Sequence, residues 1–80
     1  MEIVEIIWLD AGFENSNMPF EQAEELYPME RTSVGYLVSE GEDVLRLAFG
    51  IVNDKHHHCS VLSDILVVPR GDVKNIKRLK

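Results

Sequence analysis

The residues best suited to chemistry are His56, His57, His58 and Cys59, in the segment NDKHHHCS. Imidazole and thiolate groups are ligands for zinc, nickel and copper. Adjacent residues of an extended loop point in alternate directions, so at most two of these four side chains converge. Structural zinc sites use spaced pairs of ligands, and the sequence holds no second pair. We therefore expect a solvated hairpin loop and no metal site; the alternative is a site formed by His56 and His58.

Catalytic constellations are not evident elsewhere in the sequence. A nucleophilic cysteine needs a histidine that a third group orients, and neighbours in sequence do not usually adopt that geometry. Glu21, Glu24 and Glu25 have the spacing of a solvated helix face rather than of two carboxyls held in opposed environments. Arg70-Gly71-Asp72 is interpreted as a turn. No phosphate-binding loop or HExxH spacing occurs. The sequence thus predicts a protein that is not an enzyme and has no cofactor.

A ligand-binding group can be assembled from an aromatic and basic set. An indole or phenol ring can stack on a base while guanidinium and ammonium groups contact phosphate. Trp8 has a second interpretation, as a core or interface anchor, which is the commoner outcome for tryptophan. The residues expected to bind a ligand are Trp8, Tyr36, Arg46, Arg70 and Lys74.

Charge is unevenly placed along the chain. The formal net charge is −6, but residues 1–43 carry eleven acidic groups against Arg31, a net of −10, and residues 44–80 carry seven basic groups against three acidic ones, a net of +4. Because phosphate contacts dominate nucleic-acid affinity, binding of a polyanion by the whole surface is disfavoured. A local basic patch near the C-terminus is the exception. The alternative is that the polarity steers contacts within or between chains.

The elements that must position these residues are mostly strands. Alternating or continuous apolar runs predict strands over 2–9, 32–40, 44–52 and 61–68, and a short last strand within 73–79. A helix is expected over 18–27, with Asn17 as N-cap, Pro19 in its first turn and a stop at Pro28. Gly35 within a strand predicts a bulge or a sharp bend. Residues 40–43, 53–60 and 69–72 are the expected turns and loops.

Together these elements predict a mainly β (α+β) fold: a small five-stranded SH3-like antiparallel barrel with one short helix inserted between strands 1 and 2. Residues 1–80 form one domain. A chain this short has a small core, and one cysteine cannot close an internal disulfide. With 45% hydrophobic residues, the chain is expected to form a homo-oligomer. There is no secretory signal and no apolar run approaching a membrane span, so we expect a cytoplasmic protein without membrane contact.

Several of these segments resemble a group of small proteins encoded by tailed bacteriophages. The segments that carry this resemblance are WLDA near the start, the proline-led helix, SVGYLV followed by an acidic turn, and LVVPRGDVKNIKRL at the end. The resemblance covers nearly the whole chain, and its most distinctive parts are a hairpin and a turn. It therefore carries no functional residues over. It implies expression in the cytoplasm of an infected bacterium, and an accessory role against host defence.

Three functions are compatible with the sequence. The first is a non-enzymatic counter-defence protein that binds a host immune effector or sequesters a nucleotide immune signal. The second is an Sm-like RNA-binding or regulatory module that uses the basic C-terminal third. The third is a minor structural protein of the virion. We favour the first, whose partner is a host protein or a small nucleotide, over one whose partner is a nucleic acid.

Overall fold

The computed structural model describes residues 1–12, 16–56 and 58–79. Among them it shows five antiparallel strands in one sheet, which confirms the mainly β class. The elements are β1 (Ile3–Asp10), α1 (Phe20–Ala23), β2 (Met29–Glu40), β3 (Val44–Asp54), β4 (Cys59–Pro69), the 3-10 turn η1 (Arg70–Asp72) and β5 (Val73–Arg78).

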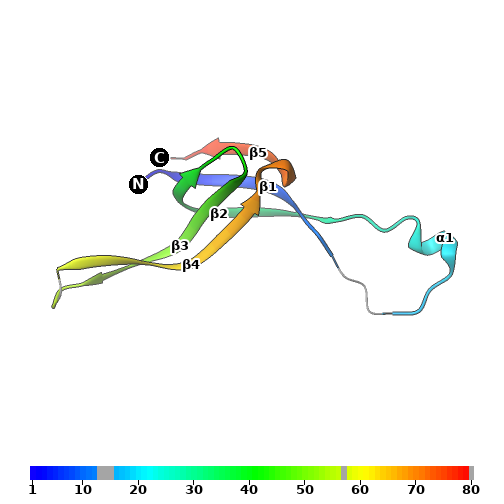
Figure 1. Cartoon of the computed structure of the whole chain (residues 1–80), viewed down its shortest axis with the longest axis horizontal. Helices are drawn as coiled ribbons and strands as arrows, with labels where there is room; N and C mark the ends of the chain where they lie inside the picture. Colours follow the sequence, from blue (N-terminus) through cyan, green and yellow to red (C-terminus); the bar gives the residue numbers. More distant parts are fainter. Residues whose placement is uncertain (13–15, 57, 80) are drawn as a thin grey trace.

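The sheet has the order β4-β3-β2-β1-β5 and curls strongly (Figure 1). β1 lies between β2 and β5, so the two ends of the chain come together at Val4 and Arg78. β4 and β5 are the two edges, and they do not pair with each other within the described ranges, so the sheet is not a closed barrel. Register shifts at Ile7/Trp8 and at Leu37/Ser39 increase the local twist where the sheet bends.

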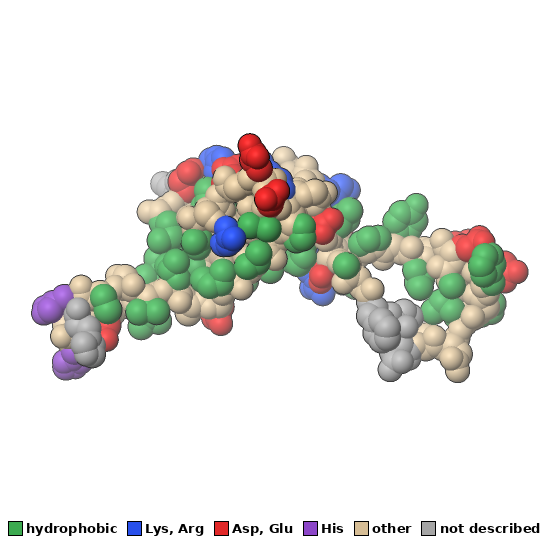
Figure 2. All heavy atoms as spheres, in the orientation of Figure 1, with side chains coloured by type: hydrophobic (Ala, Val, Ile, Leu, Met, Phe, Trp, Pro, Cys, Tyr) green, Lys and Arg blue, Asp and Glu red, His purple; other side chains and the backbone are tan. Residues whose placement is uncertain are grey.

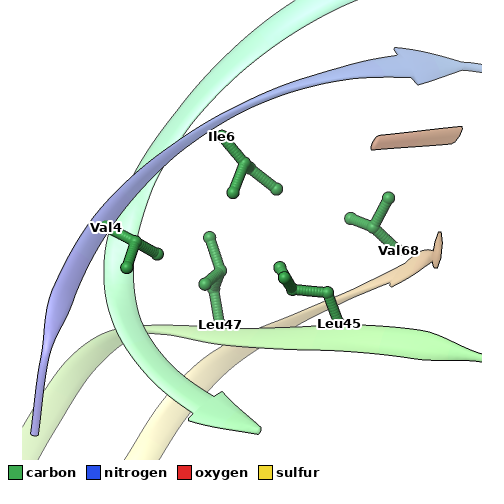
Figure 3. Close-up of a cluster of buried hydrophobic side chains, with 5 residues drawn as sticks. All are labelled: Val4, Ile6, Leu45, Leu47 and Val68. Atoms are coloured by element: carbon green, nitrogen blue, oxygen red, sulfur yellow. The ribbon is translucent and has the colours of Figure 1, made fainter. Parts of the chain in front are cut away.

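The core is small and purely aliphatic. Five side chains from β1, β3 and β4 are completely buried and point toward one another in Figure 3: Val4, Ile6, Leu45, Leu47 and Val68. The pairs within β1 and within β3 are two residues apart, as expected for one face of a strand. A second set of partly buried side chains packs against this cluster: Trp8, Leu37, Leu66, Val73 and Ile76.

Gly35 does not form the bulge expected there. It pairs in regular register with Val4, and the irregularity of β2 lies further along, between Leu37 and Ser39. Gly35 is instead a point of close approach, because a Cβ built on it would lie 2.8 Å from the carbonyl oxygen of Ala48. The missing side chain lets β2 and β3 come together over the core.

Two arms extend from the curled sheet in opposite directions, giving a shape of 57 × 24 × 20 Å (Figure 1). One is the end of the β3–β4 hairpin. β3 pairs with β2 only from Leu45 to Ala48, and beyond that point β4 is its only neighbour among the described strands. The other arm contains the ends of β1 and β2 and the segment with α1. The fold is thus a small packed centre with two thin extensions.

The helix is much shorter than predicted. α1 covers only Phe20–Ala23, and the residue before it is Pro19 rather than an Asn17 cap. Its expected apolar stripe is largely exposed, with Phe20 at 73% and Tyr27 at 90%. Short helices are marginal in water without tertiary packing. The structure describes no helix long and apolar enough to cross a membrane.

The predicted loop over residues 53–60 is also shorter. β3 and β4 continue pairing through Asn53↔Ser60 and Asp54↔Cys59, so the connection is confined to the residues between Asp54 and Cys59. The polar composition of this segment suggested a loop, but cross-strand pairing sets the register and extends both strands. His57 lies outside the described residues.

Gly35→Ala tests the close approach. The added methyl would press on the Ala48 carbonyl, and overpacking of this kind typically costs about 1–3 kcal/mol. We expect a lower urea midpoint at a fixed protein concentration. Gly71→Ala is the matched control, because a Cβ there has nothing within 4 Å. Equal midpoints for the two variants would contradict the assignment.

Candidate functional site

A groove lies where β3 leaves β2, beyond the Tyr36↔Ala48 pair. It has a volume of about 600 Å³, and its lining includes Tyr36, Phe49, Gly50, Asn53 and Ser60. We call it the Tyr36 groove. Tyr36 is partly buried and Phe49 is 48% exposed, so each can present aromatic surface to a ligand.

The polar end of the Tyr36 groove is formed by two opposed residues of the hairpin. Asn53 pairs with Ser60 in the β3–β4 register, and the Ser60 hydroxyl donates to Asn53 Oδ1 at 2.8 Å. This bond uses one of the two acceptor positions of the amide oxygen, and the NH₂ group is the hydrogen-bond donor that Asn53 offers. Aromatic surface beside an amide donor can bind a flat ring that carries acceptor atoms.

Gly50 keeps the groove close to the hairpin backbone. A Cβ at this position would lie 2.5 Å from the Ser63 hydroxyl on β4. The glycine therefore allows Ser63 to sit directly across the strand pair, and it leaves backbone exposed beside Phe49.

Of the five residues expected to bind a ligand, Tyr36 is the one that lines this groove. Arg70 and Lys74 line a second groove of about 240 Å³ beside β5. Trp8 packs against the core, and its indole N–H donates to Ser33 Oγ at 3.0 Å. Arg46 is exposed on β3 and donates to Ser39 Oγ at 3.1 Å. The set is therefore distributed over several places, and its binding role stays a prediction.

The basic groups near the second groove are engaged with glutamates. Arg78 donates to Glu40 at 2.7 Å and lies 3.6 Å from Glu2, while Arg70 lies 3.4 Å from Glu40. Lys74 binds Glu30 at 3.0 Å. Each of these pairs joins the acidic N-terminal half to the basic C-terminal half. The charge polarity of the sequence thus serves contacts within the chain.

Glu40 is the centre of this ionic cluster. The hydrogen bond from Arg78 lowers the pKa of the Glu40 carboxyl, the nearby charges of Arg78 and Arg70 act in the same direction, and partial desolvation opposes them. The same hydrogen bond raises the pKa of Arg78. Because β2 and β5 are not neighbours, the cluster ties the end of β2 to the end of β5 across β1.

The histidine loop connects β3 to β4, and its described residues are in a turn. No three His, Cys, Asp or Glu side chains converge in the described ranges. The backbone N–H of His56 donates to Asp54 Oδ1 at 3.0 Å, and His58 has a φ of 52° at the tip of the turn. These features are those of a tight hairpin turn.

Phe49, Asn53 and Ser60 were not expected to belong to a site. Phe49 appeared only as one of a row of apolar residues, and Asn53 and Ser60 as parts of a polar loop. Extending the predicted strands 44–52 and 61–68 by one residue on each side would have placed Asn53 opposite Ser60. Comparison of the chain with protein-family models, curated proteins and solved structures finds no match.

Glu40→Gln tests the ionic cluster through its pH dependence. Since the pKa of Glu40 is lowered in the folded state, its stabilising effect is present above its ordinary value of 4.5 and is lost as the pH falls through the lower folded value. We expect the variant to unfold at a lower temperature than the wild type near neutral pH, and the two to converge in acid.

Circular dichroism melts over pH about 3–7 make the comparison. Glu25→Gln, on the exposed segment after α1, is the control and should melt in parallel with the wild type at every pH. A constant difference between Glu40→Gln and the wild type over the whole range would contradict the role of the carboxylate charge.

Proposed function

We propose that the protein is a non-enzymatic binding protein whose ligand carries a flat, nucleobase-like ring, held in the Tyr36 groove. The observation that carries this proposal is the position of Tyr36 and Phe49 on one groove whose polar end is formed by Asn53 and Ser60. Stacking of a base on an aromatic side chain contributes about 1–3 kcal/mol, and the amide adds a directional contact.

Volume and chemistry both support binding of a small molecule. The 600 Å³ of the groove falls within the roughly 300–1,000 Å³ usual for such sites. The Ser60 hydroxyl donates to an amide oxygen rather than to a base that would remove its proton, so the contact orients Ser60 without activating it. A stoichiometric ligand fits this lining better than a substrate.

The biological setting comes from the resemblance to small proteins of tailed bacteriophages. In that setting the protein is a small SH3-like fold, with its curled sheet left open, in the host cytoplasm, and its ligand is a nucleotide signal of the host immune system. Sequestering the signal would require as much protein as ligand, as expected for a counter-defence protein that acts without turnover. Direct binding of a host immune protein is the other form of the same role.

An Sm-like RNA-binding function is less favoured. Arg70, Lys74 and Arg78 are each paired with a glutamate, which reduces the positive potential that would attract phosphates. That function predicts salt-dependent binding of single-stranded RNA that weakens in an Arg70→Ala/Lys74→Ala variant. If the protein is a minor structural component of the virion, mass spectrometry of purified particles should detect it.

A thermal-shift series tests the nucleobase site. Cyclic oligonucleotides and ADP-ribose-type nucleotides are the probes, and at least one should raise the melting temperature because it binds only the folded state. We expect Tyr36→Leu and Phe49→Leu each to weaken that ligand about 10- to 100-fold, the equivalent of one lost stacking contact.

Tyr27→Leu is the matched control, because Tyr27 is 90% exposed on the opposite arm and does not line the Tyr36 groove. It should bind as the wild type does. Absence of a shift with every nucleotide would overturn the proposal and favour a protein target. If the Tyr36→Leu variant binds the nucleotide as tightly as the wild type, the ligand binds to a surface other than the Tyr36 groove.

A further inference from the structure

The chain exposes more surface than a compact protein of its size. Its accessible area is 6263 Å², whereas a compact monomer of 9.1 kDa exposes about 4,900 Å². Its radius of gyration is 16.7 Å against about 12 Å for a compact chain of this length. The excess of roughly 1,400 Å² exceeds the approximately 800 Å² that one partner buries in a standard interface.

Part of this excess belongs to the β3–β4 hairpin. Beyond Ala48 the hairpin is a two-stranded ribbon, and isolated ribbons are marginally stable in water. Its antiparallel pairing nonetheless keeps one register to Asp54↔Cys59, with an irregularity at Phe49 and Asp64, where Asp64 has a φ of 56°. A sheet face that carries apolar side chains is usually buried against another layer of structure.

One face of this hairpin carries an uncovered row of aliphatic side chains. Cross-strand partners share a face of a sheet, and residues two apart in a strand share it too, so the register aligns the row along the hairpin. Figure 2 shows hydrophobic side chains along this arm and over the adjoining body. We call the row the aliphatic stripe; its members are Val52, Val61, Ile65 and Val67, which are 55, 54, 46 and 53% exposed, and Ser63 lies between Val61 and Ile65 on the same face.

The two edges of the sheet differ in their protection. β5 carries Lys74 and Lys77, and lysine on an edge strand discourages pairing with another chain. β4, eleven residues long, has Asp64 as its only charged residue. The hairpin therefore has an exposed apolar face, and its edge strand β4 carries few charged residues that would discourage pairing with another chain.

We propose that a second copy of this chain covers the aliphatic stripe and makes the protein a homo-oligomer. The fully buried core of one copy consists of five aliphatic side chains and Ala48, which is little for a chain of this length. Because the core is small, we expect a partner to cover the aliphatic stripe whenever the chain is folded. A second copy of the chain can do so, because it is synthesised together with the first.

Electrostatics also permit two copies to meet here. Each chain has a net charge of −6, which would oppose association through its acidic regions. The members of the stripe are uncharged, and the charged residues aligned with it lie at its two ends: Arg46, which is hydrogen-bonded to Ser39, and Asp54 beyond Val52. Two stripes in contact therefore bring together no like charges from their own side chains.

This inference does not depend on the proposed ligand. The stripe residues are distinct from those that line the Tyr36 groove, although both belong to the hairpin. If the protein is an oligomer but binds no nucleotide, the proposal for the aliphatic stripe still holds. If it is a monomer that binds nucleotide, that proposal is wrong and the proposal for the Tyr36 groove still holds.

Native mass spectrometry of the full chain, with multi-angle light scattering from about 1 to about 100 µM, tests the proposal. We expect a mass of twice 9.1 kDa or a higher multiple, and a melting temperature that rises with concentration. A mass of 9.1 kDa throughout that range would overturn the proposal without recourse to any variant.

A double variant, Val52→Thr/Val61→Thr, locates the interface. Threonine keeps the β-branched shape suited to a strand but puts hydroxyl groups on the stripe, so the hairpin itself should be retained. We expect the dissociation constant of the oligomer to rise at least about tenfold.

The control is Leu26→Thr/Met29→Thr, which removes comparable exposed apolar groups from the opposite arm and should keep the wild-type mass. Circular dichroism confirms that each variant is folded. Wild-type association in a folded Val52→Thr/Val61→Thr variant, or its loss in the control alone, would overturn the assignment of the stripe.

Discussion

Burial of five aliphatic side chains is the interaction on which the rest of the molecule depends. Val4 and Ile6 from β1 meet Leu45 and Leu47 from β3 and Val68 from β4, and no polar group is buried with them in the described part of the chain. Ordering each residue of a chain costs about 1–2 kcal/mol of backbone entropy, so such a small cluster leaves little margin. Strand pairing connects both arms to the sheet that is built around this cluster.

This arrangement divides the polar and apolar residues into separate roles. The charged side chains, which in the sequence suggest an anion site, are used largely to hold strands together: Glu40 joins Arg70 and Arg78, and Glu30 joins Lys74. Surface ion pairs of this kind are individually weak, but a network across β1 fixes the end of the sheet. The Tyr36 groove, by contrast, is lined largely by apolar and amide groups.

The strands could be predicted because their evidence is local. The alternation of Leu45 and Leu47 with Arg46 specifies a half-buried strand, and β3 has that face. The helix could not be predicted correctly, since a stripe containing Phe20 and Tyr27 stabilises a helix only if something packs on it. The Tyr36 groove depends on long-range register, which no single segment encodes. Trp8 satisfied the commoner interpretation by packing against the core.

The position of β1 has a kinetic consequence. This strand holds two of the five core side chains, and it is completed on one side by β5, so Val4 meets Arg78 across almost the entire chain. Loop closure over such a separation is entropically costly and slows folding. The β3–β4 hairpin can form early from local contacts, whereas β1 stays half-paired until the last strand has been synthesised. During translation the side of β1 that later pairs with β5 is therefore an unpaired edge, open to contact with other chains until β5 has been synthesised.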